Sequence, residues 1–250
     1  VLEVKDLCLP KAGGGYLVDH LNFELKKGEV LGIYGLMGAG RSEVFECLMG
    51  LHPEHTGQIL MEGKELHIKS ISQQIDSGFA LIPEDRQMQG LVQTLDIEKN
   101  CALSALKRYK KGPFLDSKKE AEKVDQEIKD IQIKVADKKL PILSLSGGNQ
   151  QKVVIGHALA TNPKLIILDE PTRGIDAGAR TDVYNIIKGL SKKGLAVLLI
   201  SSDMEEIIEL SDRAVTIHQG RLNCEFDRAD INQENLTKAS FGVIGKEKES

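Results

Sequence analysis

A glycine-rich segment between a strand pattern and a helix pattern constrains this chain most. Residues 29–34 have the apolar pattern of a strand, and a helical pattern follows through about Met49. Glycines spaced in this way let the backbone curl so that its N–H groups point at phosphate oxygens, and the following helix adds its positive N-terminal end. The sequence therefore predicts a phosphate-binding loop, with Ser42 placed to ligate Mg²⁺. Its residues are Gly35, Leu36, Met37, Gly38, Ala39, Gly40, Arg41, Ser42 and Glu43.

One residue of this loop departs from the usual phosphate-binding pattern. The pattern G-x-x-x-x-G-K-[ST] carries lysine where this chain has Arg41. Arginine keeps a permanent positive charge, but its wide planar group cannot place one compact ammonium between the β- and γ-phosphates. Taken alone, the segment is also compatible with a glycine-rich turn that binds no ligand. The strand before it and the helix after it are the context that favours phosphate binding.

Two adjacent acids end a second strand pattern. Residues 165–168 are apolar, and Asp169 and Glu170 follow them directly. A buried parallel strand presents its C-terminal residues at the edge of the sheet where ligands bind. We expect Asp169 to hold Mg²⁺ through water and Glu170 to be the catalytic carboxylate that polarises an attacking water. Two acids that only end a strand in solvent would give the same pattern, and the phosphate loop upstream favours the catalytic interpretation.

A second glycine-containing loop precedes a helix that we expect to run from Gln150 to about Ala160. Two glycines behind a serine at a helix start form a further anion-binding end. One triphosphate does not need two such loops in one domain, so we expect this loop to face a nucleotide that another domain holds. Its residues are Leu145, Ser146, Gly147, Gly148, Asn149 and Gln150.

The distribution of strand and helix patterns predicts one α/β domain over residues 1–243. Residues 1–90 and 143–225 form its core and β subdomain, and strands there alternate with helices as in a mostly parallel sheet. Residues 91–142 have helical periodicity and are rich in charged residues, so we expect an inserted helical subdomain. Residues 244–250 are expected to form a charged tail.

Composition excludes several classes of protein. The net charge of −4 argues against a nucleic-acid partner. The four cysteines have no paired spacing and the six histidines have no metal-ligand spacing, so the sequence predicts neither a disulfide framework nor a zinc site. No apolar run approaches the roughly 18 residues that a membrane span requires. The chain begins at Val1 rather than Met, and we expect it to be a piece of a longer polypeptide.

The order and spacing of these motifs resemble the ATP-binding domains of ABC transporters. The resemblance covers about residues 1–221, and in it residues 145–150 are the signature loop. The words at residues 35–41, 83–86 and 145–151 are most similar to the C-terminal, second nucleotide-binding domain of bacterial sugar importer ATPases of the ribose, galactose and autoinducer-2 type. The resemblance implies the P-loop NTPase fold of ABC ATPases, with a mostly parallel core sheet, an N-terminal antiparallel β subdomain and an inserted helical subdomain.

The resemblance also implies cofactors, partners and an activity. In this family two such domains enclose two ATP molecules, each held by the phosphate loop of one domain and the signature loop of the other. We therefore expect ATP and Mg²⁺ as cofactors of an ATP hydrolase that energises sugar import. The expected partners are a second ABC nucleotide-binding domain in the N-terminal half of the same polypeptide, transmembrane permease subunits and, indirectly, a sugar-binding protein. The expected location is the cytoplasmic face of the inner membrane, as a peripheral protein.

Three positions depart from an active member of the family. Arg41 replaces the phosphate-loop lysine, and Glu84 stands at the Q-loop position where glutamine is usual. Ser202 stands at the switch position, where a histidine usually contacts the γ-phosphate, whereas Asp176 matches the D-loop acid. Because each change weakens stabilisation of the transition state, we expect weak or absent hydrolysis by the isolated domain. The domain would instead supply its signature loop to the ATP of its partner.

Two other kinds of ABC ATPase are alternatives, namely DNA-repair ATPases and translation factors. The first require a long coiled coil between phosphate loop and signature loop, and this sequence has no sustained heptads there. The second normally keep both pockets intact, and this chain has no basic arm directed at the ribosome. The candidate for stacking on adenine is Tyr16, for which surface packing is an equally good interpretation.

Overall fold

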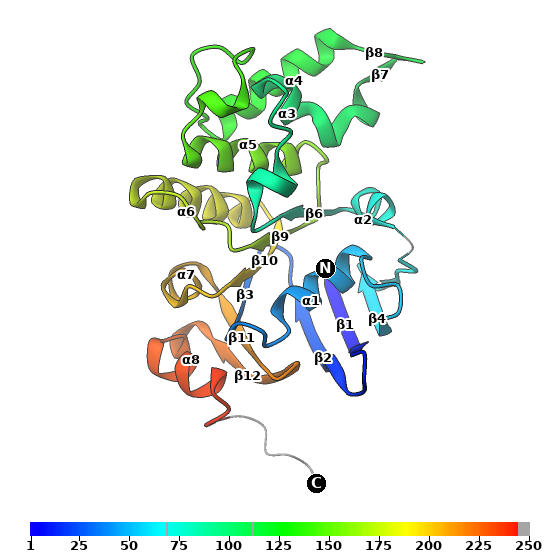
Figure 1. The fold of residues 1–250 in the computed structure, drawn as a ribbon, viewed down its shortest axis with the longest axis vertical. Helices are drawn as coiled ribbons and strands as arrows, with labels where there is room; N and C mark the ends of the chain where they lie inside the picture. The colour runs from blue at the N-terminus through cyan, green and yellow to red at the C-terminus, as the bar shows by residue number, and fades with distance from the viewer. Residues whose placement is uncertain (69, 112, 245–250) are drawn as a thin grey trace.

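The core of the chain is a six-stranded sheet with the order β12-β11-β3-β10-β9-β6 (Figure 1). The computed structural model describes residues 1–68, 70–111 and 113–244. Neighbouring strands of this sheet run parallel, except that β12 is antiparallel to β11. The mostly parallel core sheet is thereby confirmed. Its strands are β3 (Val30–Gly35), β6 (Phe79–Ile82), β9 (Leu165–Asp169), β10 (Ala196–Ser201), β11 (Arg213–His218) and β12 (Arg221–Asp227).

The central strands are apolar throughout because both faces of the sheet are covered. Every residue of β3, β9 and β10 is buried. In β9, Leu165 and Ile167 pack in the cluster that includes the N-terminal strands, whereas Ile166 and Leu168 pack in the cluster that includes the helical segments. Alternate residues thus serve opposite faces, which explains the continuous hydrophobic run at residues 165–168.

The N-terminal strands form a separate antiparallel sheet with the order β2-β1-β4-β5. Its apolar residues pack together with those of helix α1 (Arg41–Met49) and one face of the core sheet. Figure 1 shows β1 and β2 beside α1, near the N-terminus. The predicted antiparallel β subdomain is confirmed. Its strands are β1 (Leu2–Pro10), β2 (Tyr16–Leu25), β4 (Thr56–Met61) and β5 (Lys64–Glu65).

Most of the segments between β6 and β9 are helical and lie together at the top of the view in Figure 1. A short hairpin of β7 (Lys110–Lys111) and β8 (Phe114–Leu115) interrupts them, and the helical periodicity of the sequence did not predict it. Pro113 prevents a continuous helix there. The helical elements are the π-helical turn η1 (Arg86–Gly90), α3 (Ile97–Ala102), η2 (Leu103–Tyr109), α4 (Ser117–Asp130), η3 (Ile142–Ser144) and α5 (Gly147–Leu159).

Helix α5 begins at Gly147, so the predicted start at Gln150 was wrong. Glycine lowers helix propensity, which is why the sequence favours a loop at these positions. The structure places Gly148 against helix α6 (Ala177–Lys192), where an added Cβ would lie only 2.3 Å from the Cβ of Ala179. Close packing of the two helices therefore requires the glycine and outweighs its low propensity.

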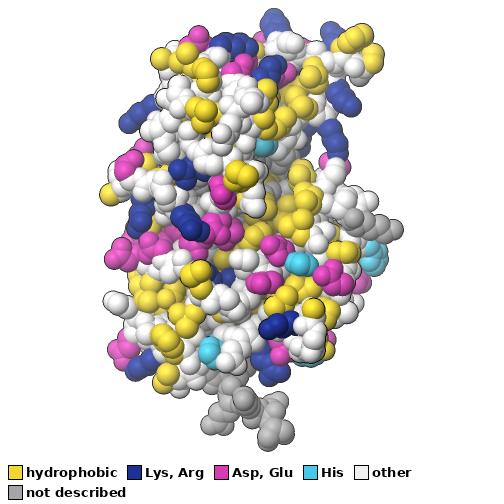
Figure 2. Space-filling view, in the orientation of Figure 1, with side chains coloured by type: hydrophobic (Ala, Val, Ile, Leu, Met, Phe, Trp, Pro, Cys, Tyr) yellow, Lys and Arg dark blue, Asp and Glu magenta, His cyan; other side chains and the backbone are white. Residues whose placement is uncertain are grey.

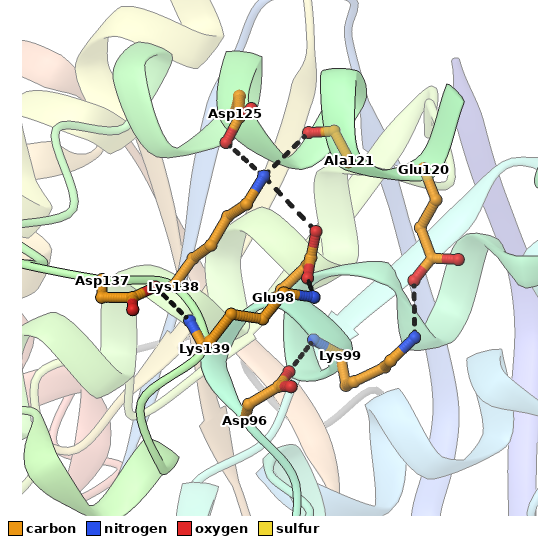
Figure 3. A network of polar contacts seen from close by, with 9 residues as sticks. All are labelled: Asp96, Glu98, Lys99, Glu120, Ala121, Asp125, Asp137, Lys138 and Lys139. Atoms are coloured by element: carbon orange, nitrogen blue, oxygen red, sulfur yellow. Dashed lines mark hydrogen bonds and ion pairs between the residues drawn. The ribbon is translucent and has the colours of Figure 1, made fainter. Parts of the chain in front are cut away.

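Ion pairs hold the helical segments to one another (Figure 3). The buried carboxylate of Glu98 pairs with both Lys138 and Lys139. Glu120 is also buried, and its Oε1 lies 3.3 Å from Nζ of Lys99. A buried carboxylate that loses its partner is strongly destabilising, so these pairs fix the relative positions of α3, α4 and the segment that precedes η3.

The remaining helices flank the core sheet. Among the described residues, the helices lack the combination of length and hydropathy that a bilayer crossing requires. The boundaries that the sequence predicts for the subdomains stay predictions, and the predicted tail lies outside the described residues except for Ile244. The remaining helices are α2 (Ile71–Ser77), α7 (Met204–Leu210), η4 (Arg228–Asp230) and α8 (Gln233–Ser240).

Candidate functional site

A cleft of about 590 Å³ lies at the C-terminal ends of β3, β9 and β10, which meet at one edge because these strands are parallel. It brings together predicted residues from the phosphate loop, from the Q-loop position, from the end of β9 and from the segment after β10. These residues are Met37, Gly38, Gly40, Arg41, Ser42, Glu43, Glu84, Asp169, Glu170 and Ser202. Gly35, Leu36 and Ala39 belong to the same loop but do not line the cleft.

The phosphate loop follows a path that leaves no space for a side chain at two of its glycines. A Cβ added at Gly35 would lie 2.6 Å from the carbonyl oxygen of Ile217. At Gly40, whose φ is +102°, an added Cβ would lie 2.6 Å from the carbonyl oxygen of Leu17. Helix α1 begins directly afterwards at Arg41. The glycine spacing of the sequence is therefore what lets the loop run between its neighbours and turn into α1.

Arg41 turns back from the first position of α1 onto the predicted catalytic carboxylate. Its Nη1 lies 3.1 Å from Oε1 of Glu170, and the two side chains are only 11% and 13% exposed. Glu170 also accepts hydrogen bonds from the backbone N–H of Ser202 at 2.7 Å and from Oγ of Ser201 at 3.3 Å. The φ of Glu170 is +46°, an uncommon conformation that clusters at functional sites when the residue is not glycine. These contacts fix the orientation of the Glu170 carboxylate, and Arg41 is its ion-pair partner.

Two acids of the cleft hold their protons more tightly than ordinary carboxyl groups. Burial, and then repulsion from Glu170, raise the pKa of Asp169 to about 7. Burial also raises the pKa of Glu206 to about 7, although hydrogen bonds from Ser201 and Thr172 favour its ionised form. Oγ1 of Thr172 donates to Oε1 of Glu206 at 2.9 Å. Strongly perturbed carboxyl groups in a cleft are typical of functional sites.

Oxygen donors that suit Mg²⁺ line the same cleft. Ser42 contributes a hydroxyl from the first turn of α1, and Asp169 contributes a carboxylate from the end of β9. Mg²⁺ prefers hard oxygen ligands and usually keeps several waters. A cation there would favour the ionised form of Asp169 and so oppose the effect of burial on its pKa. The residues present fit the Mg²⁺ ion that the sequence predicts, and their role as ligands stays a prediction.

Two arginines that sequence reasoning missed also line the cleft. Arg173 forms an ion pair with Glu84, the residue at the Q-loop position. Nη1 of Arg180 lies 3.0 Å from Oδ2 of Asp203. No motif marks either arginine, and each meets a carboxylate from a different element, so only the fold reveals these pairs.

The signature loop does not line this cleft. Ser146 is exposed at the start of α5, where its Oγ accepts a hydrogen bond from Nδ2 of Asn149 at 3.1 Å. Gly147 lies beside Arg86, whose Nη2 would be 2.9 Å from a Cβ added at Gly147. Asp176, the predicted D-loop acid, accepts a hydrogen bond from a backbone N–H in the first turn of α6 and does not line the cleft either. The two phosphate-directed motifs of the sequence therefore occupy separate places.

Tyr16, the candidate for stacking on adenine, lies outside the cleft lining. The residue is 48% exposed, and its ring meets the ring of His20 edge-on, with 5.8 Å between the centroids. No aromatic side chain is found among the described residues that line the cleft. The choice between adenine stacking and surface packing for Tyr16 stays a prediction.

Comparison with known proteins connects this arrangement to a family. Residues 18–173 match the ABC transporter family. The ribose import ATP-binding protein RbsA of Rhodopirellula baltica is 41% identical over 244 residues, which is 96% of this chain and 48% of that protein. The xylose import ATP-binding protein XylG of Photobacterium profundum is 36% identical over 239 residues, which is 94% of this chain and 47% of that protein. The chain thus spans about half the length of these curated relatives.

Solved structures support the same fold. A nucleotide-free ATP-binding cassette from an ABC transporter superposes with a TM-score of 0.84 at 21% identity, over 98% of this chain and 99% of that chain. A dimeric ATP-binding cassette in a post-hydrolysis state with ADP and Pi gives a TM-score of 0.78 at 20% identity, over 91% of this chain and 99% of that chain. With the ABC ATPase fold and the family match in agreement, the chain belongs to the ABC transporter family.

Proposed function

We propose that this chain is an ATP-binding domain that energises sugar import and that its own nucleotide site is catalytically degenerate. The similarity to a ribose and a xylose import ATP-binding protein supports sugar import as the process that the chain energises. The chain would act as the second half of a two-domain ATPase, supplying its signature loop to the ATP held by the other half. Permease subunits and, indirectly, a sugar-binding protein would be its further partners, at the cytoplasmic face of the inner membrane.

The Arg41–Glu170 ion pair carries this proposal. In an active site of this kind the loop cation contacts the phosphates while the carboxylate orients the attacking water, so the two groups work apart. Here they are 3.1 Å apart and nearly buried. Removing the partner of a buried charge costs about 3–5 kcal/mol. If Arg41 moved to a phosphate, Glu170 would be left without its cation, and this cost would oppose nucleotide binding.

The remaining charged side chains of the cleft also oppose the binding of a triphosphate. Three cations line it, and each is paired with a carboxylate, namely Arg41 with Glu170, Arg173 with Glu84 and Arg180 with Asp203. Three further carboxylates line it as well, those of Glu43, Asp169 and Glu206. An incoming triphosphate must therefore compete with carboxylates for every one of these arginines. Ser202 adds no imidazole that could contact a γ-phosphate.

The signature loop supports the second part of the proposal. It lies at the start of the thirteen-residue helix α5, outside the cleft of its own chain, and Ser146 is exposed there. A helix start with glycines offers backbone N–H groups and a positive dipole end to an anion. We expect this end to face a nucleotide bound by another domain.

The proposal is tested by the ATP hydrolysis of the purified chain. We expect no turnover above that of Glu170→Gln, because the loop lysine, the Q-loop glutamine and the switch histidine are all replaced. A turnover of about 1 s⁻¹, as in a slow enzyme, would contradict the proposal if Glu170→Gln abolished it, because it would show an active site.

A further inference from the structure

The β1–β2 pair carries a cluster of metal-ligating side chains that the nucleotide site does not use. Asp6 and Cys8 lie on β1 and His20 lies on β2. One potential ligand atom from each of the three lies within 4.8 Å of the others, and within the described part of the chain no other such group of three or more occurs. We propose that Asp6, Cys8 and His20 form a zinc site.

The ligand set suits Zn²⁺ in kind and in arrangement. Zinc binds thiolate sulfur, imidazole nitrogen and carboxylate oxygen at about 2.0–2.3 Å, so tetrahedral ligands lie about 3.3–3.8 Å apart. Nδ1 of His20 lies 2.5 Å from Oδ1 of Asp6, and Sγ of Cys8 accepts the backbone N–H of His20 at 3.3 Å. Cys8 is 3% exposed, whereas the side chains of Asp6 and His20 are 67% and 57% exposed. The sulfur thus closes the site on the inside, and a metal ion enters from solvent after the Asp6–His20 pair opens by about 1 Å.

A fourth residue points to a ligated histidine. Oδ1 of Asp19 is buried and has no hydrogen-bond partner among the described residues, and it lies 3.8 Å from Nε2 of His20. The other oxygen of this carboxylate accepts a hydrogen bond from Nε of Arg221 at 2.6 Å. Metal-ligating histidines usually donate their second ring N–H to a carboxylate, which fixes the tautomer. If Nδ1 of His20 bound the metal, its Nε2 would carry the proton and could donate it to Oδ1 of Asp19. The Asp6–His20 contact alone gives this buried oxygen no hydrogen-bond partner.

The backbone holds the ligands in an uncommon conformation. Asp6 has a φ of +54° and His20 a φ of +52°, and the pairing of β1 with β2 shifts register between Val4 and Leu7. Asn22 fixes both residues, since its Oδ1 accepts the N–H of Asp6 and its Nδ2 donates to the carbonyl of His20, each at 2.9 Å. Left-handed residues other than glycine persist only where their surroundings determine them, and they cluster at ligand sites.

The site also lies close to the phosphate loop along the chain of hydrogen bonds. The N–H of Asp19 donates to the carbonyl of Gly220 at 2.8 Å, and the N–H of Gly220 donates to the carbonyl of Ala39 at 2.9 Å. A metal ion that ties β1 to β2 would therefore stiffen the strand that supports this loop. Because the ligands come together only in the folded chain, zinc should bind the folded state and raise the melting temperature.

Titration of the purified, metal-free chain with Co²⁺, which reports thiolate ligation by an absorption band in the near ultraviolet, tests the proposal. We expect one Co²⁺ per chain with this band, displacement by Zn²⁺ and loss of the band in Cys8→Ser. Cys224→Ser is the matched control, because Cys224 lies outside the cluster, and it should keep the band. Absence of the band in the unmodified chain, its persistence in Cys8→Ser or its loss in Cys224→Ser would overturn the proposal.

Three further variants decide the matter if the buried Cys8→Ser chain does not fold. Asp6→Asn and His20→Asn replace largely exposed side chains by one that tolerates a positive φ. Each should weaken Zn²⁺ binding by more than about 100-fold, since a lost ligand costs more than a lost outer partner. Asp19→Asn should weaken it by about 10–100-fold while the Co²⁺ band stays at its wavelength. Unchanged Zn²⁺ affinity in His20→Asn would overturn the proposal.

Discussion

Helices α1 and α5 both begin at glycine-rich loops, yet the charged side chains beside their N-terminal ends differ. At α1, the side chain of Arg41 folds back onto Glu170, and the other cations of the cleft are also paired with carboxylates. At α5, Ser146 is exposed and the helix starts with two glycines. A phosphate-binding motif alone therefore does not determine how strongly a helix end attracts a phosphate. The partners of its charged residues also matter, and at α1 the partner of Arg41 is Glu170, which follows β9.

The largest effect is expected from placing a negative charge at the start of α5. Gly147→Asp places a carboxylate where backbone N–H groups are proposed to meet the partner's γ-phosphate, so ATP hydrolysis by the assembled transporter should fall by about 10²–10³-fold or more. An added Cβ meets only the end of the flexible Arg86 side chain within 3 Å, so the fold should adapt. Hydrolysis and sugar uptake are measured with the proposed two-domain ATPase, and nucleotide binding with this chain, where we expect little change.

Gly189→Asp is the matched control for this substitution. Gly189 lies in α6, and an added Cβ there meets nothing within 4 Å. It introduces the same charge on a helix of the same chain, away from the proposed partner surface, and should leave hydrolysis unchanged. Normal uptake by the Gly147→Asp protein would mean that the working site does not depend on this signature loop.

A smaller effect is expected from releasing Arg41 from its ion pair at the start of α1. Glu170→Gln removes the charge that holds Arg41, so the guanidinium becomes free to meet a phosphate. The affinity for ATP should increase by about tenfold or more, equivalent to at least about 1.4 kcal/mol. Isothermal titration of the purified chain measures it. Glu43→Gln is the control, because Glu43 also lines the cleft but is not the partner of Arg41. Equal increases in the two variants would mean that total charge, not the ion pair, limits binding.

The raised pKa of Asp169 predicts a pH dependence of Mg²⁺–nucleotide binding. Asp169 has a pKa of about 7 and must lose its proton before it takes a cation, so binding should strengthen as the pH rises through 7. Between pH 6 and pH 8 the gain in affinity is expected to be about tenfold. Asp169→Asn should remove this dependence. Glu206→Gln should retain it, although Glu206 also titrates near pH 7, because the proposed cation ligand is Asp169.

Sequence reasoning succeeded where the signal was local or periodic. The apolar run at residues 165–168 predicts a buried strand because each face of the sheet receives alternate residues, and the glycine spacing at residues 35–40 predicts a strand–loop–helix unit because only that spacing fits the path. It failed where the contact joins distant parts of the chain. Arg41 and Glu170 are 129 residues apart, and no local pattern indicates that they pair.

The cluster of Asp6, Cys8 and His20 shows the same limit. The sequence predicts no zinc site, because its cysteines and histidines have no recognised spacing, and this stays a prediction beside the proposed site. The ligand atoms come together only through the antiparallel pairing of β1 and β2 and the register shift between them. The start of α5 at Gly147 likewise involves close packing of Gly148 against α6, and helix propensities carry no information about such tertiary contacts.

The smallest change is expected from Arg41→Lys alone, and the decisive experiment compares this variant with one in which Arg41, Glu84 and Ser202 are all replaced. Lysine would regain a phosphate contact, but Glu84 and Ser202 would still lack the groups that complete the transition state, and residues that act as a unit are not additive. We measure ATP hydrolysis by Arg41→Lys beside the triple variant Arg41→Lys, Glu84→Gln, Ser202→His, with Glu170→Gln added to each as the inactive control. We expect ATP hydrolysis to rise by less than about tenfold in the single variant and by about 10²-fold or more in the triple one. Full activity in Arg41→Lys alone would contradict this expectation.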